Sequence, residues 1–145
     1  MSAAIRAKAV CLFRHNGKVL LAEGYDPAKD QNYLIPVGGG IEFGETSLQA
    51  AEREVKEEIG ADVTSLELLG VSENLFTFDG RTGHEIVFVY QGRFVDQGFY
   101  RKTHIDGIET NGVEFVVKWV EESEVLAGKI PIYPDGISEM LQPKE

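Results

Sequence analysis

The chain has 145 residues, of which 43% are hydrophobic and 26% are charged, a composition typical of a soluble globular protein and unlike that of a disordered chain. Its length predicts a single domain over residues 1–145. The formal net charge of −10 argues against a nucleic-acid polymer as partner, because such binding depends on clustered Lys and Arg, but a small phosphate ligand held through a metal ion is compatible with it.

The cysteine content and the N-terminal segment indicate a cellular location. Cys11 is the single cysteine and lies in the apolar run 9–13, so we expect it to pack as a small buried hydrophobe in a reducing compartment. Residues 1–8 contain no long apolar stretch, and nowhere do about 18 apolar residues follow one another. We therefore expect a cytoplasmic protein with neither a signal peptide nor a membrane span.

The first third of the chain predicts strands and turns. Apolar segments at 7–14 and 18–23 flank Asn16-Gly17, a dipeptide typical of two-residue hairpin turns, and predict a β-hairpin. A polar loop over 24–32 and a short strand over 33–37 are expected next. The glycine cluster 38–40 is interpreted as a break between elements.

The pattern over residues 46–59 predicts a helix. Thr46 and Gln49 are spaced as a capping box, and Gly60 is placed to end the helix. The apolar positions recur at three- and four-residue spacing and are Leu48, Ala51, Val55 and Ile59.

Later segments predict further strands and two short helices. Strands are expected at 64–73, 85–95 and 113–120, and helices at 121–126 and 135–141. Strands around one strong central helix, with helices at the end, predict an α/β fold in which a mixed sheet lies between helical layers.

Acidic residues on the central helix point to a metal site. Glu54, Glu57 and Glu58 lie three and four residues apart on one face, where like charges cost roughly 0.2–0.5 kcal/mol per pair. A divalent cation would reverse the sign of that cost, and oxygen ligands without a Cys or His cluster suit Mg²⁺ or Mn²⁺. A merely solvated acidic face is the alternative interpretation.

The spacing of these residues matches the Nudix signature G-x5-E-x7-R-E-U-x-E-E-x-G-U, in which U is aliphatic. The chain therefore resembles a small MutT-like member of the Nudix hydrolase family, with the signature over residues 39–61. Ala61 departs from the pattern at a packing position, which affects core fit more than chemistry. The matching residues are Gly39, Glu45, Arg53, Glu54, Val55, Glu57, Glu58 and Gly60.

The resemblance implies a Nudix-type α/β/α sandwich and a metal-dependent hydrolase. It makes Glu54, Glu57 and Glu58 ligands of Mg²⁺ or Mn²⁺, with the Gly38 carbonyl as an additional ligand. It also makes Arg53 and Glu45 supports that orient these glutamates, although a solvated charge is the simpler interpretation of Arg53.

The implied reaction is hydrolysis of a diphosphate linkage in a nucleoside diphosphate joined to another moiety. Bound cations would bridge the diphosphate oxygens and lower the pKa of a bound water, whose proton a carboxylate would take. The alternative function is a catalytically silent nucleotide-binding or regulatory module, and a homodimer is expected only by analogy with relatives.

The general base and the substrate contacts stay open at this point. The base is either a signature glutamate or one of Glu85, Glu109 and Glu114. Candidate substrate contacts are Gly39, Arg81, His84 and Phe76. Tyr33, Phe78 and Tyr133 are further aromatic platforms for a nucleobase, with a place in the core as the alternative for each.

Overall fold

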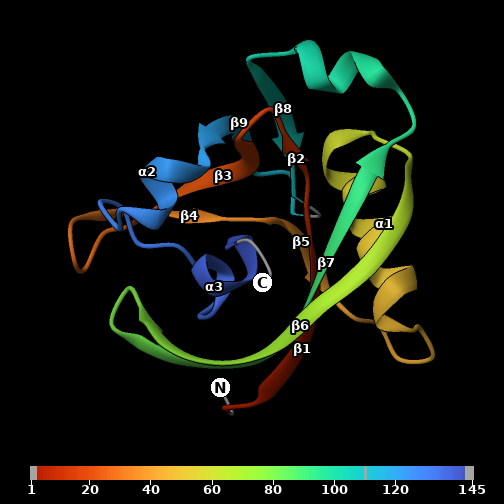
Figure 1. Cartoon of the computed structure of the whole chain (residues 1–145). Helices are drawn as coiled ribbons and strands as arrows, with labels where there is room; N and C mark the ends of the chain where they lie inside the picture. Colours follow the sequence, from red (N-terminus) through yellow and green to blue (C-terminus); the bar gives the residue numbers. More distant parts are fainter. Residues whose placement is uncertain (1–2, 110, 143–145) are drawn as a thin grey trace.

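A mixed sheet forms one half of the computed structural model, which describes residues 3–109 and 111–142 (Figure 1). The strand order is β5-β1-β7-β6. Strand β1 runs parallel to β7 and antiparallel to β5, and β6 and β7 form a long antiparallel hairpin. The strands are β1 (Ile5–Leu12), β5 (Val37–Gly40), β6 (Val63–Phe78) and β7 (Arg81–Phe94).

An antiparallel sheet forms the other half. Its order is β2-β3-β9-β8, and β4 pairs with β3 beside this path. A 3₁₀ helix, η1 (Gln97–Arg101), precedes β8 along the chain. The strands are β2 (Arg14–His15), β3 (Lys18–Asp26), β4 (Gln31–Ile35), β8 (His104–Ile108) and β9 (Glu114–Glu121).

Helices cover the sheets on two sides, as Figure 1 shows, and this confirms the predicted α/β/α arrangement. Helix α1 (Ser47–Ile59) lies on one side, and α2 (Glu122–Leu126) and α3 (Ile137–Leu141) lie on the other. Alternate residues of β1 point to opposite faces of the sheet and pack into two separate hydrophobic cores. Ala9 and Cys11 pack with α1, and Val10 and Leu12 pack with α2 and α3. Within the described ranges, no helix is long and apolar enough to span a membrane.

Helix α1 begins and ends where the sequence predicts. Thr46 and Gln49 form both hydrogen bonds of a capping box, and Gly60 ends the helix with φ of 71°. Ala51, Val55 and Ile59 are buried as expected, whereas the inclusion of Leu48 in the apolar face is wrong because its side chain is exposed. Ala61 is buried in the same core, in agreement with its interpretation as a packing position.

The predicted N-terminal hairpin is wrong in extent. Only β2 pairs with the start of β3 across Asn16-Gly17, whereas β1 belongs to the other sheet. Both faces of β1 are apolar and buried over residues 9–12, and the strand occupies a central position between two neighbouring strands rather than a hairpin edge.

Several other segments are more extended than predicted. The expected loop 24–32 contains the end of β3 and the start of β4, and the glycine cluster 38–40 is part of β5. The strand expected at 64–73 continues to Phe78, and β7 begins at Arg81, so that Asp79-Gly80 forms the turn between them. Neither β8 nor η1 is predicted by the sequence patterns.

The buried thiol of Cys11 gives a test of this packing. Burial raises its pKa to about 12, so the reactive thiolate is suppressed by roughly a thousandfold, in addition to the steric protection of a side chain with no exposed surface. We expect no reaction of the native protein with a disulfide reagent at pH 8 and rapid reaction in denaturant. A native reaction at the unfolded rate would contradict the placement of β1.

Candidate active site

Three side chains of α1 contact the three consecutive glycines of β5. The Gly38 N–H donates to Oε1 of Glu58 at 3.1 Å, and Nη2 of Arg53 donates to the Gly40 carbonyl at 2.9 Å. Between them, a Cβ atom on Gly39 would lie 2.5 Å from the carboxylate carbon of Glu54. Because glycine has no side chain, the helix can bring its carboxylates against this edge of the sheet.

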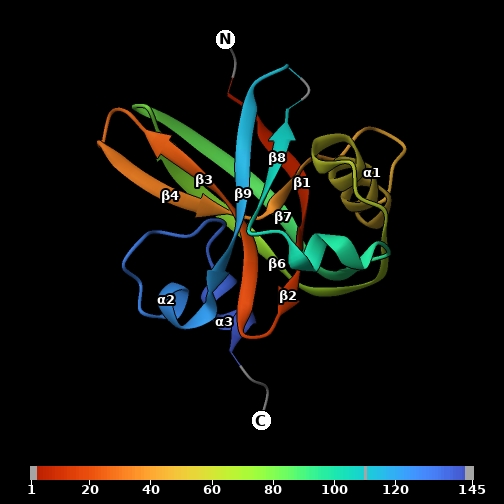
Figure 2. The same cartoon turned by 90° about the horizontal axis from the view of Figure 1, so that it is seen from above.

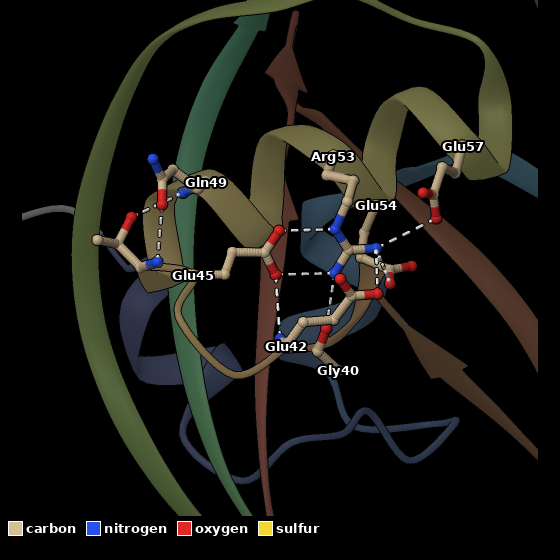
Figure 3. Close-up of polar contacts among 8 residues, drawn as sticks. Gly40, Glu42, Glu45, Gln49, Arg53, Glu54 and Glu57 are labelled. Carbon is tan, nitrogen blue, oxygen red and sulfur yellow. Dashed lines mark hydrogen bonds and ion pairs between the residues drawn. The ribbon is translucent and has the colours of Figure 1, made fainter.

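Arg53 connects the loop before the helix to the glutamates on it (Figure 3). Its guanidinium forms a two-pronged ion pair with Glu45, with Nε···Oε2 at 2.7 Å and Nη2···Oε1 at 2.9 Å. Its Nη1 donates to Glu54 at 2.9 Å and to Glu57 at 3.2 Å. One cation therefore neutralises part of the negative charge of several carboxylates.

This ion pair persists over the whole physiological pH range. The hydrogen bonds from Arg53 lower the pKa of Glu45 to about 2, and the bonds to Glu45 raise the pKa of Arg53. Since the pKa of Glu45 in the folded chain is depressed, the pair stabilises the fold above the usual carboxylate pKa and is lost only as the pH falls towards 2.

Glu58 lies in the least favourable electrostatic position of the cluster. Burial, followed by the negative charge of Glu54, raises its pKa to about 8, and the Gly38 N–H and Lys8 oppose that shift. Glu57 is exposed and turned towards Arg53. Among the described residues, no three His, Cys, Asp or Glu side chains already converge on one metal position. Arg53 bonds Glu54 and Glu57, whereas Glu58 accepts the Gly38 N–H.

The donor set nevertheless suits a hard divalent cation. Glu54, Glu57 and Glu58 offer only carboxylate oxygens, and the repulsion between Glu54 and Glu58 is the kind that a bound cation relieves. The Gly38 peptide contacts this cluster through its N–H, which donates to Glu58.

A cavity of about 230 Å³ lies between β4 and the strands β6 and β7. The structure brings all four aromatic candidates to its wall, namely Tyr33, Phe76, Phe78 and Tyr133. Glu85 and Lys8 line it too and form an ion pair at 3.6 Å. Asp26 and Lys29 form a second ion pair in the wall, which thus combines rings for stacking with paired charges.

Two residues connect this cavity electrostatically to the glutamates of α1. Lys8, in its wall, opposes the raised pKa of Glu58, and Glu109 raises the pKa of both Glu58 and Tyr33. The sequence analysis did not assign Lys8 to the site. A charged residue among the apolar residues of a strand was the available signal, because such a residue needs a partner or a ligand.

Other candidates lie apart from this arrangement. Arg81 is exposed beside the turn of the β6–β7 hairpin, and Glu114 is exposed opposite Ile108 at the start of β9. His84 precedes Glu85 on β7 and therefore faces the other side of the sheet, where its Nε2 is buried without a hydrogen-bond partner. The structure does not bring these three side chains into the cavity wall.

Comparison with known families agrees with this fold. The family model of the NUDIX domain matches residues 4–140, and the chain therefore belongs to the Nudix family. The family comprises hydrolases of nucleoside diphosphate derivatives.

Individual relatives support the same assignment. A protein of Mycobacterium tuberculosis (strain CDC 1551 / Oshkosh) named MutT4 is 46% identical over 90 residues, which cover 52% of this chain and 36% of that protein. The chain thus spans only about a third of the length of this relative.

Solved structures share the fold. A NUDIX hydrolase from Nitrosomonas europaea aligns with a TM-score of 0.66 and 21% identity, over 95% of this chain and 86% of the other. A MutT protein from Methanosarcina mazei Go1 aligns with a TM-score of 0.61 and 18% identity, over 97% and 92% of the two chains. At these identities the likeness concerns the fold.

Adjacent glycines of β5 provide a matched test of the helix contact. A Cβ on Gly39 would collide with Glu54, whereas a Cβ on Gly40 would lie 3.7 Å from its nearest neighbour, Arg6. We expect Gly39→Ala to displace Glu54 and lower kcat/KM by about 100-fold, because small misplacements of site groups are that costly. Gly40→Ala should remain within a few-fold of wild type, and equal losses in both variants would contradict the special role of Gly39.

The multiple bonds of Arg53 predict that lysine cannot replace it. A lysine retains the charge but not the planar fork that contacts Glu45, Glu54 and the Gly40 carbonyl together. We expect Arg53→Lys to lower activity by about 10- to 100-fold. The same change at exposed Arg93 is the control, and wild-type activity in Arg53→Lys would show that charge alone suffices.

Proposed function

We propose that this chain is a Mg²⁺- or Mn²⁺-dependent hydrolase of a nucleoside diphosphate joined to another moiety. Water attacks phosphorus and the diphosphate linkage is cleaved. The observation that carries the proposal is the packing of Glu54, Glu58 and Arg53 on the glycines of β5, electrostatically coupled to an aromatic cavity.

The glutamates of α1 would hold the metal. Glu54, Glu57 and Glu58 are the ligands, and the Gly38 carbonyl is an additional one. When bound, the cation lowers the pKa of its water and neutralises charge on the diphosphate. The ion pair of Arg53 with Glu45 holds the loop before the helix against α1. The bond from Arg53 to Glu54 then keeps Glu54 beside Gly39.

A carboxylate takes the proton of the attacking water. Among the candidates outside the signature, Glu85 lies in the cavity wall. The negative charge of Glu109 raises the pKa of both Glu58 and Tyr33. Glu114 lies on the β8–β9 ladder. Outside the signature, position therefore favours Glu85 or Glu109 over Glu114 as the base, and a signature glutamate is the alternative.

The cavity would accept the nucleoside end of the substrate. A volume of about 230 Å³ suits a ring-sized group better than a whole nucleotide, which leaves the phosphates to extend towards α1. Tyr33 and Phe76 offer faces or edges for stacking. Lys8 lies where its ammonium can contact a phosphate oxygen on the way to Glu58.

The wider assignments follow the same chemistry. The net charge of −10 supports a small-molecule substrate held through metal rather than a nucleic-acid polymer or a membrane surface. The free, buried Cys11 supports a reducing, cytoplasmic location. A homodimer is retained as an analogy with relatives.

Glu57 and Glu52 allow specific metal binding to be separated from charge screening. Both are exposed glutamates on α1, but only Glu57 belongs to the predicted ligand set. Mg²⁺ at about 100 times its dissociation constant should stabilise wild type and Glu52→Gln by roughly 2.7 kcal/mol, provided that the unfolded chain does not bind it. Glu57→Gln should lose most of this gain in melting curves at constant ionic strength, and equal shifts in all three proteins would refute coordination by Glu57.

Hydrolysis assays decide between an enzyme and a silent binding module. The substrates are nucleotide sugars, dinucleoside polyphosphates and nucleoside triphosphates, each with and without Mg²⁺ or Mn²⁺. We expect metal-dependent turnover of at least one class, abolished in Glu58→Gln and retained in Glu52→Gln. Metal-dependent ligand binding without turnover would support the module instead.

A further inference from the structure

We propose that Asp26 is a positioning residue that holds two hairpin tips together over the aromatic cavity and thereby determines which group fits into it. This inference rests on the proposed function, because it concerns the nucleoside end of the same substrate. Asp26 lines the cavity and is 4% exposed.

Both hairpins extend beyond the strands that support them. Strand β3 pairs with β9 only from Lys18 to Ala22, and its remaining residues up to Asp26 pair with β4 alone. The tip of the β6–β7 hairpin lies beyond His84, where the pairing with β1 ends. Figures 1 and 2 both show the two tips side by side.

The carboxylate of Asp26 joins these tips. Its Oδ1 accepts the Ala28 N–H at 3.0 Å, within its own turn, and the Asp79 N–H at 3.0 Å, from the other hairpin. Lys29 lies 3.9 Å from Oδ2, so the buried charge has a partner. Hydrogen bonds to an ionised acceptor are stronger than neutral ones, which suits a single group that bridges two hairpins.

An aromatic contact crosses the same gap. Tyr33 on β4 meets Phe78 on β6 edge-on, with ring centroids 6.1 Å apart, and both rings line the cavity. The separation of the tips therefore sets the separation of these rings. If the Asp26 bond is lost, the rings part and a planar group in the cavity loses contacts, whereas the phosphate end near α1 is unaffected.

Three variants isolate this bond. Asp26→Ala removes the acceptor, and Asp26→Asn keeps a carbonyl oxygen that can accept both N–H groups. Asp30→Asn is the matched control, because it removes one negative charge from the same turn while Asp30 contacts Tyr25 rather than β6 or β7. Asparagine also tolerates the φ of 48° at this position.

Amide exchange tests the bridge itself. We expect the Asp79 N–H to exchange at least about tenfold faster in Asp26→Ala than in wild type, because its acceptor is gone. Asp26→Asn and Asp30→Asn should exchange as wild type does. Identical rates in Asp26→Ala and wild type would overturn the inference, whatever the enzyme hydrolyses.

Binding of two non-hydrolysable probes tests the consequence for selection. Calorimetry with Mg²⁺ compares α,β-methylene-ADP with methylenediphosphonate, which carries the same phosphorus bridge without a nucleoside. We expect Asp26→Ala to bind α,β-methylene-ADP about tenfold more weakly, with its affinity for methylenediphosphonate unchanged and with Asp26→Asn restoring wild-type binding. A variant that merely destabilised the fold would weaken both probes.

The remaining outcomes are also decisive. Unchanged affinity of Asp26→Ala for α,β-methylene-ADP, or wild-type affinities that are equal for the two probes, would overturn the role in selection. Failure of wild type to bind either probe would instead count against the proposed function. Amide exchange at Asp79 then still reports on the bridge.

Discussion

Close packing of α1 against the glycine strand β5 is the contact on which the rest of the site depends. Without a side chain on Gly39, the helix approaches until Glu54 lies against the strand and Glu58 accepts the Gly38 N–H, and both glutamates are partly removed from water. This approach places like charges together in a poorly solvated environment, which opposes folding. The site therefore depends on the missing side chain of Gly39. A Cβ atom added there would collide with the carboxylate of Glu54.

Arg53 limits the electrostatic cost of this arrangement without abolishing it. Glu45, in the loop before the helix, binds two nitrogens of the Arg53 guanidinium. The loop therefore fixes the orientation of this group, which also bonds the glutamates of α1. Glu58 receives no bond from Arg53 in the described contacts, and burial and the charge of Glu54 raise its pKa, which favours its protonated form. The two apolar cores on either side of β1 stabilise the fold and offset the unfavourable electrostatic energy of the glutamate cluster.

Features encoded by neighbouring residues were predictable, and features that depend on distant pairing were not. Helix α1 was predicted closely because its caps, its apolar face and the signature all lie within one short segment. The glycines were predicted as a break because glycine disfavours strands, yet pairing with β1 and contact with α1 override that preference. The aromatic candidates come from separate segments, so no spacing could indicate that they share a cavity.

The parallel pairing of β1 with β7 has a consequence for synthesis. Ile5 pairs with His84 and Leu12 with Gln91, so this pairing can form only after β7, far along the chain from β1, has been synthesised. Until then, residues 9–12, which are apolar on both faces of the strand, lack this partner in the nascent polypeptide. Such long-range closure slows folding, because the entropy of closing the intervening loop must be offset before the contacts between β1 and β7 form.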